Sequence, residues 1–357
     1  QIRKNSFMNI KLSKVKKSKI SDVDFSNLGF CKYYTDHMFI CDYEDKSWKN
    51  FRIVPFEDLK LSPACTTLHY GQTIFEGLKA YKNDNDDILI FRSDKNAKRF
   101  NISAHRMCMP SIPEEIFTDS INQLLNVEKD WVPSGKDNSL YIRPLMFAVD
   151  PYIGIKPADK YIFMIICGLA GGYYSEPVNV KIEKKYTRAI SGGVGYAKTA
   201  ANYAAALYPA VEAQKEGYHQ LIWTDGKEHN YVEESGTMNL FFVINNTLIT
   251  PPLGDTVLDG VTRDSIISVC SELDIKVEVR KISINEIIDS LDKGLMTEAF
   301  GAGTAATVAP IKTIGYNSKN YNLPKIDKSD YSQKILDYLN KIKFGKIEDK
   351  FGWVTKL

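Results

Sequence analysis

One lysine, Lys198, stands in surroundings that are unusual for a charged residue. It lies in the stretch GGVGYAKTAANY (192–203), between Ala197 and Thr199, and no acidic residue follows it before Glu212. Small neighbours leave space beside the amine, and low polarity favours its neutral, nucleophilic form. The alternative is a lysine at the start of a helix, with its ammonium group in solvent. Lys198 is therefore a candidate for covalent chemistry with a carbonyl group.

A carbonyl cofactor held by an amine, such as pyridoxal phosphate, requires four groups from a protein. These are a lysine, an acid at the pyridine nitrogen, a phosphate cradle and a hydrogen-bond donor to the ring oxygen. Glu234, in the strand-like segment VEESGTMNLFF, is a candidate for the acid. Glu233 precedes it, but neighbouring residues of a strand face opposite sides, so only one of the two should point inward. The alternative for this pair is two solvated carboxylates.

Two glycine-containing turns could hold a phosphate group. In DGVTRDSIISVC, Gly260, Val261 and Thr262 stand just before a predicted helix, whose first N–H groups would be available to an anion. The segment FGAGTAATVAP offers a second turn, with Thr304 among small neighbours. Arg99, in the first half of the chain, could add a charge-assisted hydrogen bond.

These candidates require elements on both sides of a break in the chain. Residues 28–167 contain strand-like aromatic and β-branched segments and two predicted helices, at 93–106 and 114–132. This half is predicted to be a small α+β domain. The stretch at 168–177, rich in Gly and Pro, is predicted to be an interdomain linker. Residues 178–357 mix strands and helices and form the predicted larger domain.

The composition excludes several classes of protein. Hydrophobic residues make up 44% and charged residues 25% of the 357 residues, as in ordinary soluble globular proteins. The net charge of +2 argues against nucleic acid or a membrane surface as a partner. No apolar run approaches the ~18 residues of a membrane-spanning helix. Six cysteines without CxxC spacing and five histidines without a ligand-spaced cluster predict reduced thiols and no metal site.

The N-terminal residues 1–27 are predicted to be a solvated, poorly ordered leader. The segment carries Arg3 and several lysines, and no acidic residue precedes Asp22. Met8 is a candidate for the native start, which would make residues 1–7 an added remnant. The leader is Lys-rich and has little apolar face, unlike an Arg-rich transit peptide. The expected compartment is the cytoplasm, with mitochondrial targeting by this leader as the alternative.

From Glu234 onward the residues match a known pattern. The run ESGTMNLF, then LIT, then LDGVTR resembles the signature of class IV pyridoxal phosphate aminotransferases throughout. From about Phe30 to the C-terminus the chain resembles branched-chain amino acid aminotransferases, through FCKYYTDHM, LHYGQTIFEGLKAY, NAKRF, SLYIRP, YAKTAANY, ESGTMNLFF and FGAGTAATVAP. The resemblance implies a mixed α and β, fold type IV enzyme with a small N-terminal α+β domain and a larger C-terminal domain on a barrel-like sheet. It also implies a homodimer with active sites near the interface.

The resemblance implies a role for each matching residue. Lys198 looks like the lysine that forms a Schiff base with pyridoxal 5'-phosphate and moves protons, Tyr203 like the donor to the ring oxygen, and Glu234 like the partner of the pyridinium nitrogen. The other cofactor contacts would come from Thr237, on the substrate side, and from a phosphate-binding set of Arg99, Val261, Thr262 and Thr304. Substrate contacts are implied for an aromatic pocket of Phe30, Phe75, Tyr141 and Tyr173, for an interface region with Tyr70, Ile153 and Ile155, for Arg143 at the far carboxylate of glutamate, and for the backbone N–H of Ala305 at the substrate carboxylate.

The implied reaction is reversible, ping-pong transfer of the amino group from L-leucine, L-isoleucine or L-valine to 2-oxoglutarate. Two alternatives on the same fold are a D-amino acid aminotransferase and an aminodeoxychorismate lyase, which share the lysine, the glutamate and the phosphate cradle. The aromatic pocket with Tyr141 and Arg143 argues against both. A non-catalytic binding protein of this fold is the third alternative. The joint presence of the lysine, tyrosine, glutamate and both turns argues against it.

Overall fold

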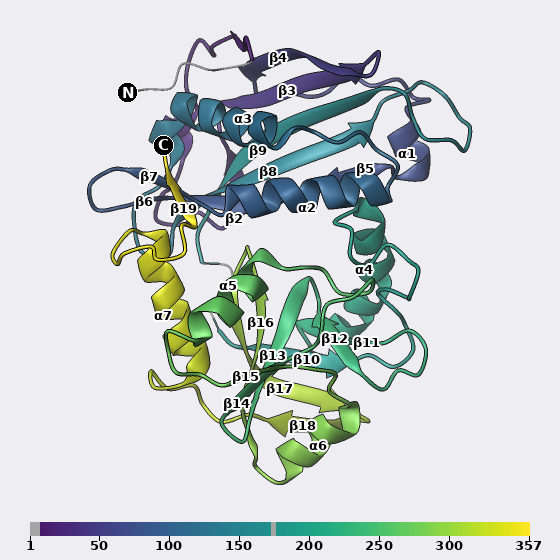
Figure 1. Ribbon diagram of the computed structural model, residues 1–357, viewed down its shortest axis with the longest axis vertical. Helices are drawn as coiled ribbons and strands as arrows, with labels where there is room; N and C mark the ends of the chain where they lie inside the picture. Colours follow the sequence, from purple (N-terminus) through teal and green to yellow (C-terminus); the bar gives the residue numbers. More distant parts are fainter. Residues whose placement is uncertain (1–7, 173–175) are drawn as a thin grey trace. The chain divides into compact units, whose positions relative to one another are not determined.

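The computed structural model describes residues 8–172 and 176–357, which fall into two compact units (Figure 1). The first unit holds the described residues up to 172, together with 197–200 and 343–357. The second unit holds residues 176–196 and 201–342. Both units combine a sheet with helices, so the predicted mixed α and β class is confirmed.

A ten-stranded sheet forms the frame of the first unit. Its strands are β1 (Lys11–Leu12), β2 (Phe30–Tyr34), β3 (His37–Glu44), β4 (Ser47–Pro55), β5 (Thr73–Phe75), β6 (Leu78–Lys82), β7 (Ile88–Phe91), β8 (Ser139–Ala148), β9 (Tyr161–Ala170) and β19 (Val354–Lys356). They follow the order β1-β4-β3-β9-β8-β6-β7-β19, with β2 on β9 and β5 on β8. In this register Phe75 lies opposite Leu145, so it shares a sheet face with Tyr141 and Arg143.

Two amphipathic helices pack on this sheet. The helices predicted at 93–106 and 114–132 are α2 (Ser93–Arg106) and α3 (Glu114–Val127), the second being followed by the 3-10 turn η2 (Lys129–Trp131). Phe100 of α2, Phe117 of α3 and Phe163 of β9 are fully buried, with ring centroids 5.4, 5.5 and 5.9 Å apart. A shorter helix, α1 (Thr66–Tyr70), precedes β5. The aromatic contacts fix α2 on the sheet, and with it Arg99.

The prediction of a poorly ordered leader is wrong for residues 8–27. Strand β1 pairs in parallel with β4, and the Val15 N–H donates to Nε2 of His37 at 2.9 Å. His37 is buried, and its Nδ1 bonds to the carboxylate of buried Glu128. The leader therefore finds hydrogen-bond partners on the folded unit, which its basic composition did not reveal. Residues 1–7 lie outside the described part of the chain.

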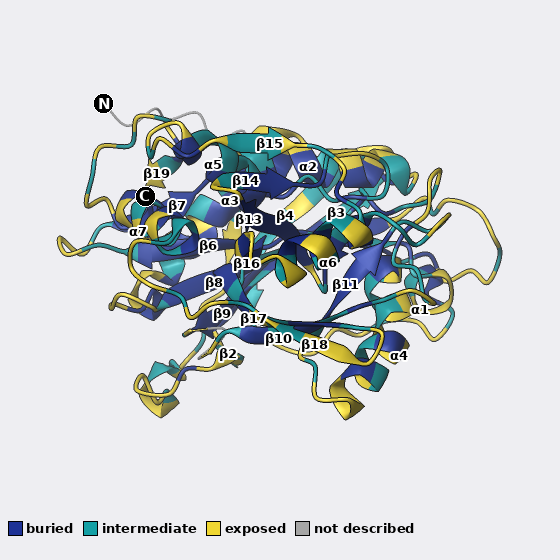
Figure 2. Cartoon of the chain, turned by 90° about the horizontal axis from the view of Figure 1, so that it is seen from below, coloured by how far each residue is buried: buried dark blue, intermediate teal, exposed yellow. Residues whose placement is uncertain are grey.

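The second unit is built on a closed barrel. Its strands are β10 (Val178–Ile182), β11 (Gln220–Thr224), β12 (Val232–Ser235), β13 (Met238–Ile244), β14 (Thr247–Thr250), β15 (Val277–Val279), β16 (Met296–Gly303), β17 (Thr307–Tyr316) and β18 (Lys319–Asn322). The order is β12-β11-β10-β17-β16-β13-β14-β15, and the pairing of β12 with β13 closes the ring of the first six. Strand β13 is buried at every residue (Figure 2), as its sequence MNLFFVI requires. The predicted barrel-like sheet is thus confirmed.

Four helices complete this part of the chain. They are α4 (Ala200–Lys215), α5 (Val261–Cys270), α6 (Ile284–Asp292) and α7 (Tyr331–Lys343). The side-chain oxygen of Ser283 caps α6 by accepting a hydrogen bond from the N–H of Glu286. Helix α5 starts directly after Gly260, in the turn predicted to bind an anion. Across the described residues, no helix has the length and apolar character needed to cross a membrane.

The predicted domain bounds need correction in three places. Strand β9 extends to Ala170, so the linker predicted at 168–177 begins inside a strand. Residues 197–200 belong to the first unit, because the carbonyl of Lys198 accepts a hydrogen bond from the Phe75 N–H. Residues 343–357 also belong there, because β19 pairs with β7. A three-residue edge strand pairs through its backbone, so its side-chain pattern carries little signal.

Candidate active site

The backbone around Lys198 is held on both sides within the first unit. The Lys198 N–H donates to Oγ of Ser103 at 2.9 Å, and its carbonyl accepts from the Phe75 N–H at 3.0 Å. The next residue, Thr199, donates its hydroxyl to the Thr73 carbonyl at 2.8 Å. The Lys198 ammonium group lies 4.9 Å from the centroid of the Phe75 ring, and the residue is only partly exposed. The lysine is therefore fixed beside an aromatic face before α4 begins.

An aromatic cluster on the same unit surrounds Arg143. The Arg143 guanidinium carbon lies 4.4 Å from the ring centroid of Phe75, and Nη2 donates to the Tyr141 hydroxyl at 2.8 Å. The ring of Phe30 meets Tyr141 edge-on, with centroids 5.0 Å apart. Nε of Arg143 is buried and has no hydrogen-bond partner among the described residues. An unpaired, buried cationic donor beside apolar rings is suited to an anionic group on an otherwise aliphatic ligand.

Gly77 makes room for this cluster. A Cβ placed on Gly77 would come within 2.2 Å of the Tyr141 hydroxyl oxygen. The motif IFEGLKAY therefore has a glycine where the tyrosine approaches the backbone, which is a packing reason for that residue.

Arg99 is held by a carboxylate that the sequence reading did not single out. Its Nε and Nη2 donate to the two oxygens of Glu76, at 2.7 and 2.8 Å. Asn96 donates to the same carboxylate at 2.7 Å, and Glu76 is completely buried. The pair is bidentate and fixes the guanidinium plane. An acid inside the apolar run TIFEGLKAY was the available signal for Glu76.

In the second unit, one pocket brings together three of the predicted residues. Tyr203, Glu234 and Thr237 line it. The other lining residues are Arg188, Asn202, Ala206, Gly236, Asn239 and Leu258. A phenol, a carboxylate and a threonine hydroxyl around one cavity provide the acceptor and donors expected for the ring of a pyridoxal cofactor.

The Glu234 carboxylate is buried and strongly held. Glu234 is only 3% exposed. Its Oε1 accepts hydrogen bonds from Asn239 Nδ2 at 3.2 Å and from the Leu258 N–H at 3.1 Å. Oε2 lies 2.7 Å from Nε of Arg188. Donors and a cation of this kind favour the charged form of a carboxyl group. Arg188 and Asn239 were missed in the sequence, because they lie far from Glu234 or carry no distinctive pattern.

The two predicted anion-binding turns occur where they were expected. Gly260 precedes α5 and supplies no side chain to cap its first turn, while Val261 and Thr262 begin the helix and are buried. A Cβ on Gly260 would lie 1.9 Å from Oδ1 of Asn239, so a larger residue would have to displace the Asn239 side chain. Thr304 lies in the turn between β16 and β17. A helix start with buried residues and no side-chain cap has the chemistry of a phosphate cradle.

Comparisons with known proteins agree with this geometry. Residues 73–314 match the family described as Amino-transferase class IV. A probable branched-chain-amino-acid aminotransferase of Staphylococcus epidermidis is 44% identical over 335 residues, covering 92% of this chain and 93% of the relative. Branched-chain-amino-acid aminotransferase 2 of Bacillus subtilis is 40% identical over 352 residues, covering 98% and 96%. The chain belongs to the branched-chain aminotransferase family, within class IV of the aminotransferases.

Solved structures show the same fold. The branched-chain aminotransferase of Thermoproteus uzoniensis with norvaline has a TM-score of 0.75 and 26% identity, and the match covers 90% of this chain and 99% of that one. The branched-chain amino acid aminotransferase of Escherichia coli has a TM-score of 0.71 and 26% identity, over 89% and 98%. The protein is a pyridoxal phosphate-dependent transaminase by family, as predicted.

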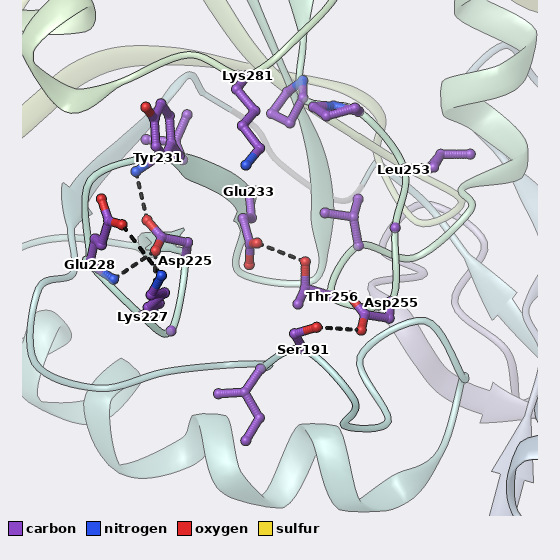
Figure 3. A pocket seen from close by; sticks show the side chains of 17 residues that line it. Ser191, Asp225, Lys227, Glu228, Tyr231, Glu233, Leu253, Asp255, Thr256 and Lys281 are labelled. Atoms are coloured by element: carbon purple, nitrogen blue, oxygen red, sulfur yellow. Dashed lines mark hydrogen bonds and ion pairs between the residues drawn. The ribbon is translucent and has the colours of Figure 1, made fainter.

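The neighbour of Glu234 faces away from the pocket of this aminotransferase. Glu233 lines a separate pocket and accepts a hydrogen bond from the Thr256 hydroxyl at 2.7 Å (Figure 3). The Lys281 side chain extends toward it there. Burial raises the pKa of Glu233, and the hydrogen bond from Thr256 partly opposes that rise. The prediction that only one of the two glutamates points inward is confirmed.

The remaining predicted substrate contacts of the aminotransferase are less enclosed. Tyr70 is 43% exposed, Ile153 62% and Ile155 94%. Ala305 lies in the turn with Thr304. Tyr173 lies outside the described residues. The roles of all these residues at a substrate or a subunit interface stay predictions.

Proposed function

We propose that this aminotransferase exchanges amino groups between L-leucine, L-isoleucine or L-valine and 2-oxoglutarate, giving branched 2-oxo acids and L-glutamate. The observation that carries the substrate assignment is the cluster of Arg143 with Phe75, Tyr141 and Phe30. Rings of this kind favour burial of a branched aliphatic side chain by about 2 kcal/mol. The buried, unpaired Nε of Arg143 suits the far carboxylate of glutamate, which must enter by turns with the aliphatic substrate.

Pyridoxal 5'-phosphate is the cofactor in this proposal, and the residues of the chain fit its parts. Glu234 offers an anionic acceptor for a protonated ring nitrogen, and Tyr203 a donor for the ring oxygen. Val261 and Thr262, at the uncapped start of α5, would hold the phosphate, together with Thr304 and with Arg99 as a cation. When bound, the cofactor supplies an electron sink for the charge left at the substrate Cα.

Lys198 has two tasks in the proposed reaction. Its amine would bind the cofactor covalently and, once displaced by the substrate amine, take the proton from Cα and return it to the cofactor side. The hydrogen bonds of its backbone to Ser103 and Phe75 fix the position from which the side chain acts. The Phe75 ring covers one side of the amine and reduces its contact with water.

Assembly as a homodimer is part of the same proposal. Exposed apolar residues gather near the end of α1 and in the loop after β8, where a monomer would leave them in water. They are Leu68, Tyr70, Tyr152, Ile153 and Ile155. Burial of this surface against a second copy would remove that cost, and sedimentation of the purified protein measures the oligomeric state directly.

The visible absorption spectrum of the purified protein, loaded with pyridoxal 5'-phosphate, tests the function. We expect a band of the lysine-bound cofactor that bleaches when L-leucine is added without any oxo acid and returns with 2-oxoglutarate. Lys198→Ala should bind the cofactor without this band and without turnover. A band that ignores L-leucine and responds to D-alanine would replace the substrate assignment. Failure of the protein to bind the cofactor at all would favour a non-catalytic protein of this fold.

A further inference from the structure

Arg188 is a buried cation that contacts three parts of the second unit. It lies in the segment after β10, and its side chain is 9% exposed. Nε lies 2.7 Å from Oε2 of Glu234, in a direction outside that of a regular hydrogen bond, so the contact is an ion pair. Nη2 donates to the carbonyl of Gly195 at 3.2 Å and to the carbonyl of Thr256.

These two carbonyls belong to segments that lie against each other. A Cβ on Gly195 would come within 2.9 Å of Cα of Thr256, so the two backbones are in close contact. The Tyr196 N–H donates to the Asp255 carbonyl at 3.2 Å, and the Gly192 N–H donates to the Asp255 carboxylate at 2.6 Å. Segment 191–196 leads directly to Lys198, and the loop at 254–258 ends at Leu258, whose N–H binds Glu234.

Burial of an arginine and a glutamate is costly unless both are paired and hydrogen-bonded. Arg188 meets this condition only because the carbonyls and the Glu234 carboxylate surround it. An arginine stays protonated at all ordinary pH values, so the positive charge beside Glu234 is permanent. A cation at this distance lowers the basicity of a carboxylate, and a weakly basic carboxylate leaves a shared proton on its partner.

We propose that Arg188 is a positioning residue for the transamination chemistry, which acts through Glu234. It holds this carboxylate ionised and oriented, so that the proton between Glu234 and the cofactor ring stays on the ring nitrogen. It also anchors the segment that leads to Lys198 to the loop that binds Glu234. The inference rests on the role proposed for Glu234 above and assigns to Arg188 the control of that role.

A double-mutant cycle separates this role from a merely structural one. The variants are Arg188→Gln, Glu234→Gln and the two combined, each loaded with pyridoxal 5'-phosphate and mixed with L-leucine in a single turnover. We expect Arg188→Gln alone to slow bleaching of the cofactor band by roughly tenfold or more. In the Glu234→Gln background the same change should cost less than about twofold, because no carboxylate is left to act on. An equal loss in both backgrounds would overturn the proposal.

The visible band of the bound cofactor provides a readout that does not depend on turnover. Arg188→Gln should change the visible band of the bound cofactor, because the protonation of the ring changes, and Glu234→Gln should remove this effect. Arg188→Lys keeps the charge without the guanidinium fork, so it should restore much of the band and the rate. A spectrum unchanged in Arg188→Gln would contradict the proposal.

Arg280 provides the matched control. It is a partly exposed arginine of the same unit, paired with Glu286 at 2.6 Å and with Glu278 at 3.1 Å. Arg280→Gln should leave the cofactor band and the half-reaction unchanged, and a loss equal to that of Arg188→Gln would overturn the assignment. If the unsubstituted protein neither binds the cofactor nor responds to L-leucine, the proposed function itself fails. That outcome is distinct from a failure of the role of Arg188, which is measured only in the variants.

Discussion

The described residues of each unit include a buried arginine–glutamate pair, and the two pairs differ in how the arginine contacts the carboxylate. In the first unit, Arg99 and Glu76 form two parallel hydrogen bonds at 2.7 and 2.8 Å, and Glu76 is completely buried. In the second unit, Nε of Arg188 lies 2.7 Å from Oε2 of Glu234 without the geometry of a regular hydrogen bond, and the Glu234 carboxylate lines a pocket. The first arrangement fixes a cation, whereas the second leaves a carboxylate at the wall of a pocket.

Both pairs consist of an arginine and a glutamate, so the geometry of the pair distinguishes a carboxylate that holds an arginine in place from one that lines a pocket. A bidentate pair is rigid and specific. A pair with one contact and neighbouring neutral donors keeps the carboxylate charged without enclosing it. The following predictions test that distinction in order of decreasing expected effect.

Glu76→Gln should be the most damaging change to folding. It leaves the guanidinium of Arg99 buried without its anion, which costs about 3–5 kcal/mol when one partner of a buried pair is removed. Urea unfolding followed by tryptophan fluorescence measures the change in the free energy of unfolding. A loss below about 1 kcal/mol would show that the pair is not needed for the fold and would break the comparison.

Glu234→Gln should act on chemistry more than on folding. The amide keeps an acceptor for Asn239 and Leu258, but it cannot hold a proton on the ring nitrogen. We expect the half-reaction with L-leucine to slow by about 10²–10³-fold, as when one preorganised electrostatic group is removed. Stopped-flow absorbance measures the rate.

The neighbouring variant Glu233→Gln is the control for this prediction. Glu233 faces the other pocket and accepts a hydrogen bond from Thr256. The rate of the half-reaction in Glu233→Gln should therefore stay close to that of the unsubstituted protein. Equal slowing by both variants would contradict the assignment of Glu234 as the inward carboxylate.

Arg143→Met should extend the comparison to an arginine for which the described residues provide no salt-bridge partner. The substitution removes the cation proposed for the far carboxylate of glutamate. A hydrogen bond to a charged group contributes about 1.5–3 kcal/mol. The value of kcat/KM for L-glutamate should fall accordingly, while that for L-leucine changes far less. A parallel loss for both substrates would indicate that Arg143 serves the packing of Tyr141 and Phe75 only.

Arg280→Gln should have the smallest effect. Arg280 pairs with Glu286 at the surface, where solvent screens the interaction, and such pairs contribute about 0.2–1 kcal/mol. Thermal unfolding in low and high salt measures this contribution. A loss as large as that of Glu76→Gln would mean that burial does not distinguish the pairs.

Much of this organisation was predictable from the sequence, because the informative features are local. The segment 93–106 was predicted to be a helix and forms α2, and strand alternation predicted that Glu233 and Glu234 face opposite ways. The segment DGVTR predicted a helix just after Thr262, and α5 begins two residues earlier, at Val261. In each case residues adjacent in the chain determine the structure.

Features that depend on distant partners were not predictable in this way. Nothing in the segment TRAISGG indicates that Arg188 meets Glu234, and Glu76 could not be matched to Arg99 without the register of the fold. The docking of the leader depends on a buried histidine and glutamate from other elements. Pairing across the fold is a property of the tertiary structure, which one sequence does not display.

The chain leaves the first unit after residue 172, returns at 197–200 and ends there with 343–357. Neither unit is therefore a continuous piece of the gene product. Expression of residues 176–342 alone would separate Lys198 from Ser103 and Phe75, and expression of residues 8–172 alone would leave β7 without β19. A single crossover between two related genes would therefore exchange parts of both units at once and never one complete unit. A chimeric enzyme would keep the first unit intact only if residues 197–200 and 343–357 came from the same parent as the residues up to 172.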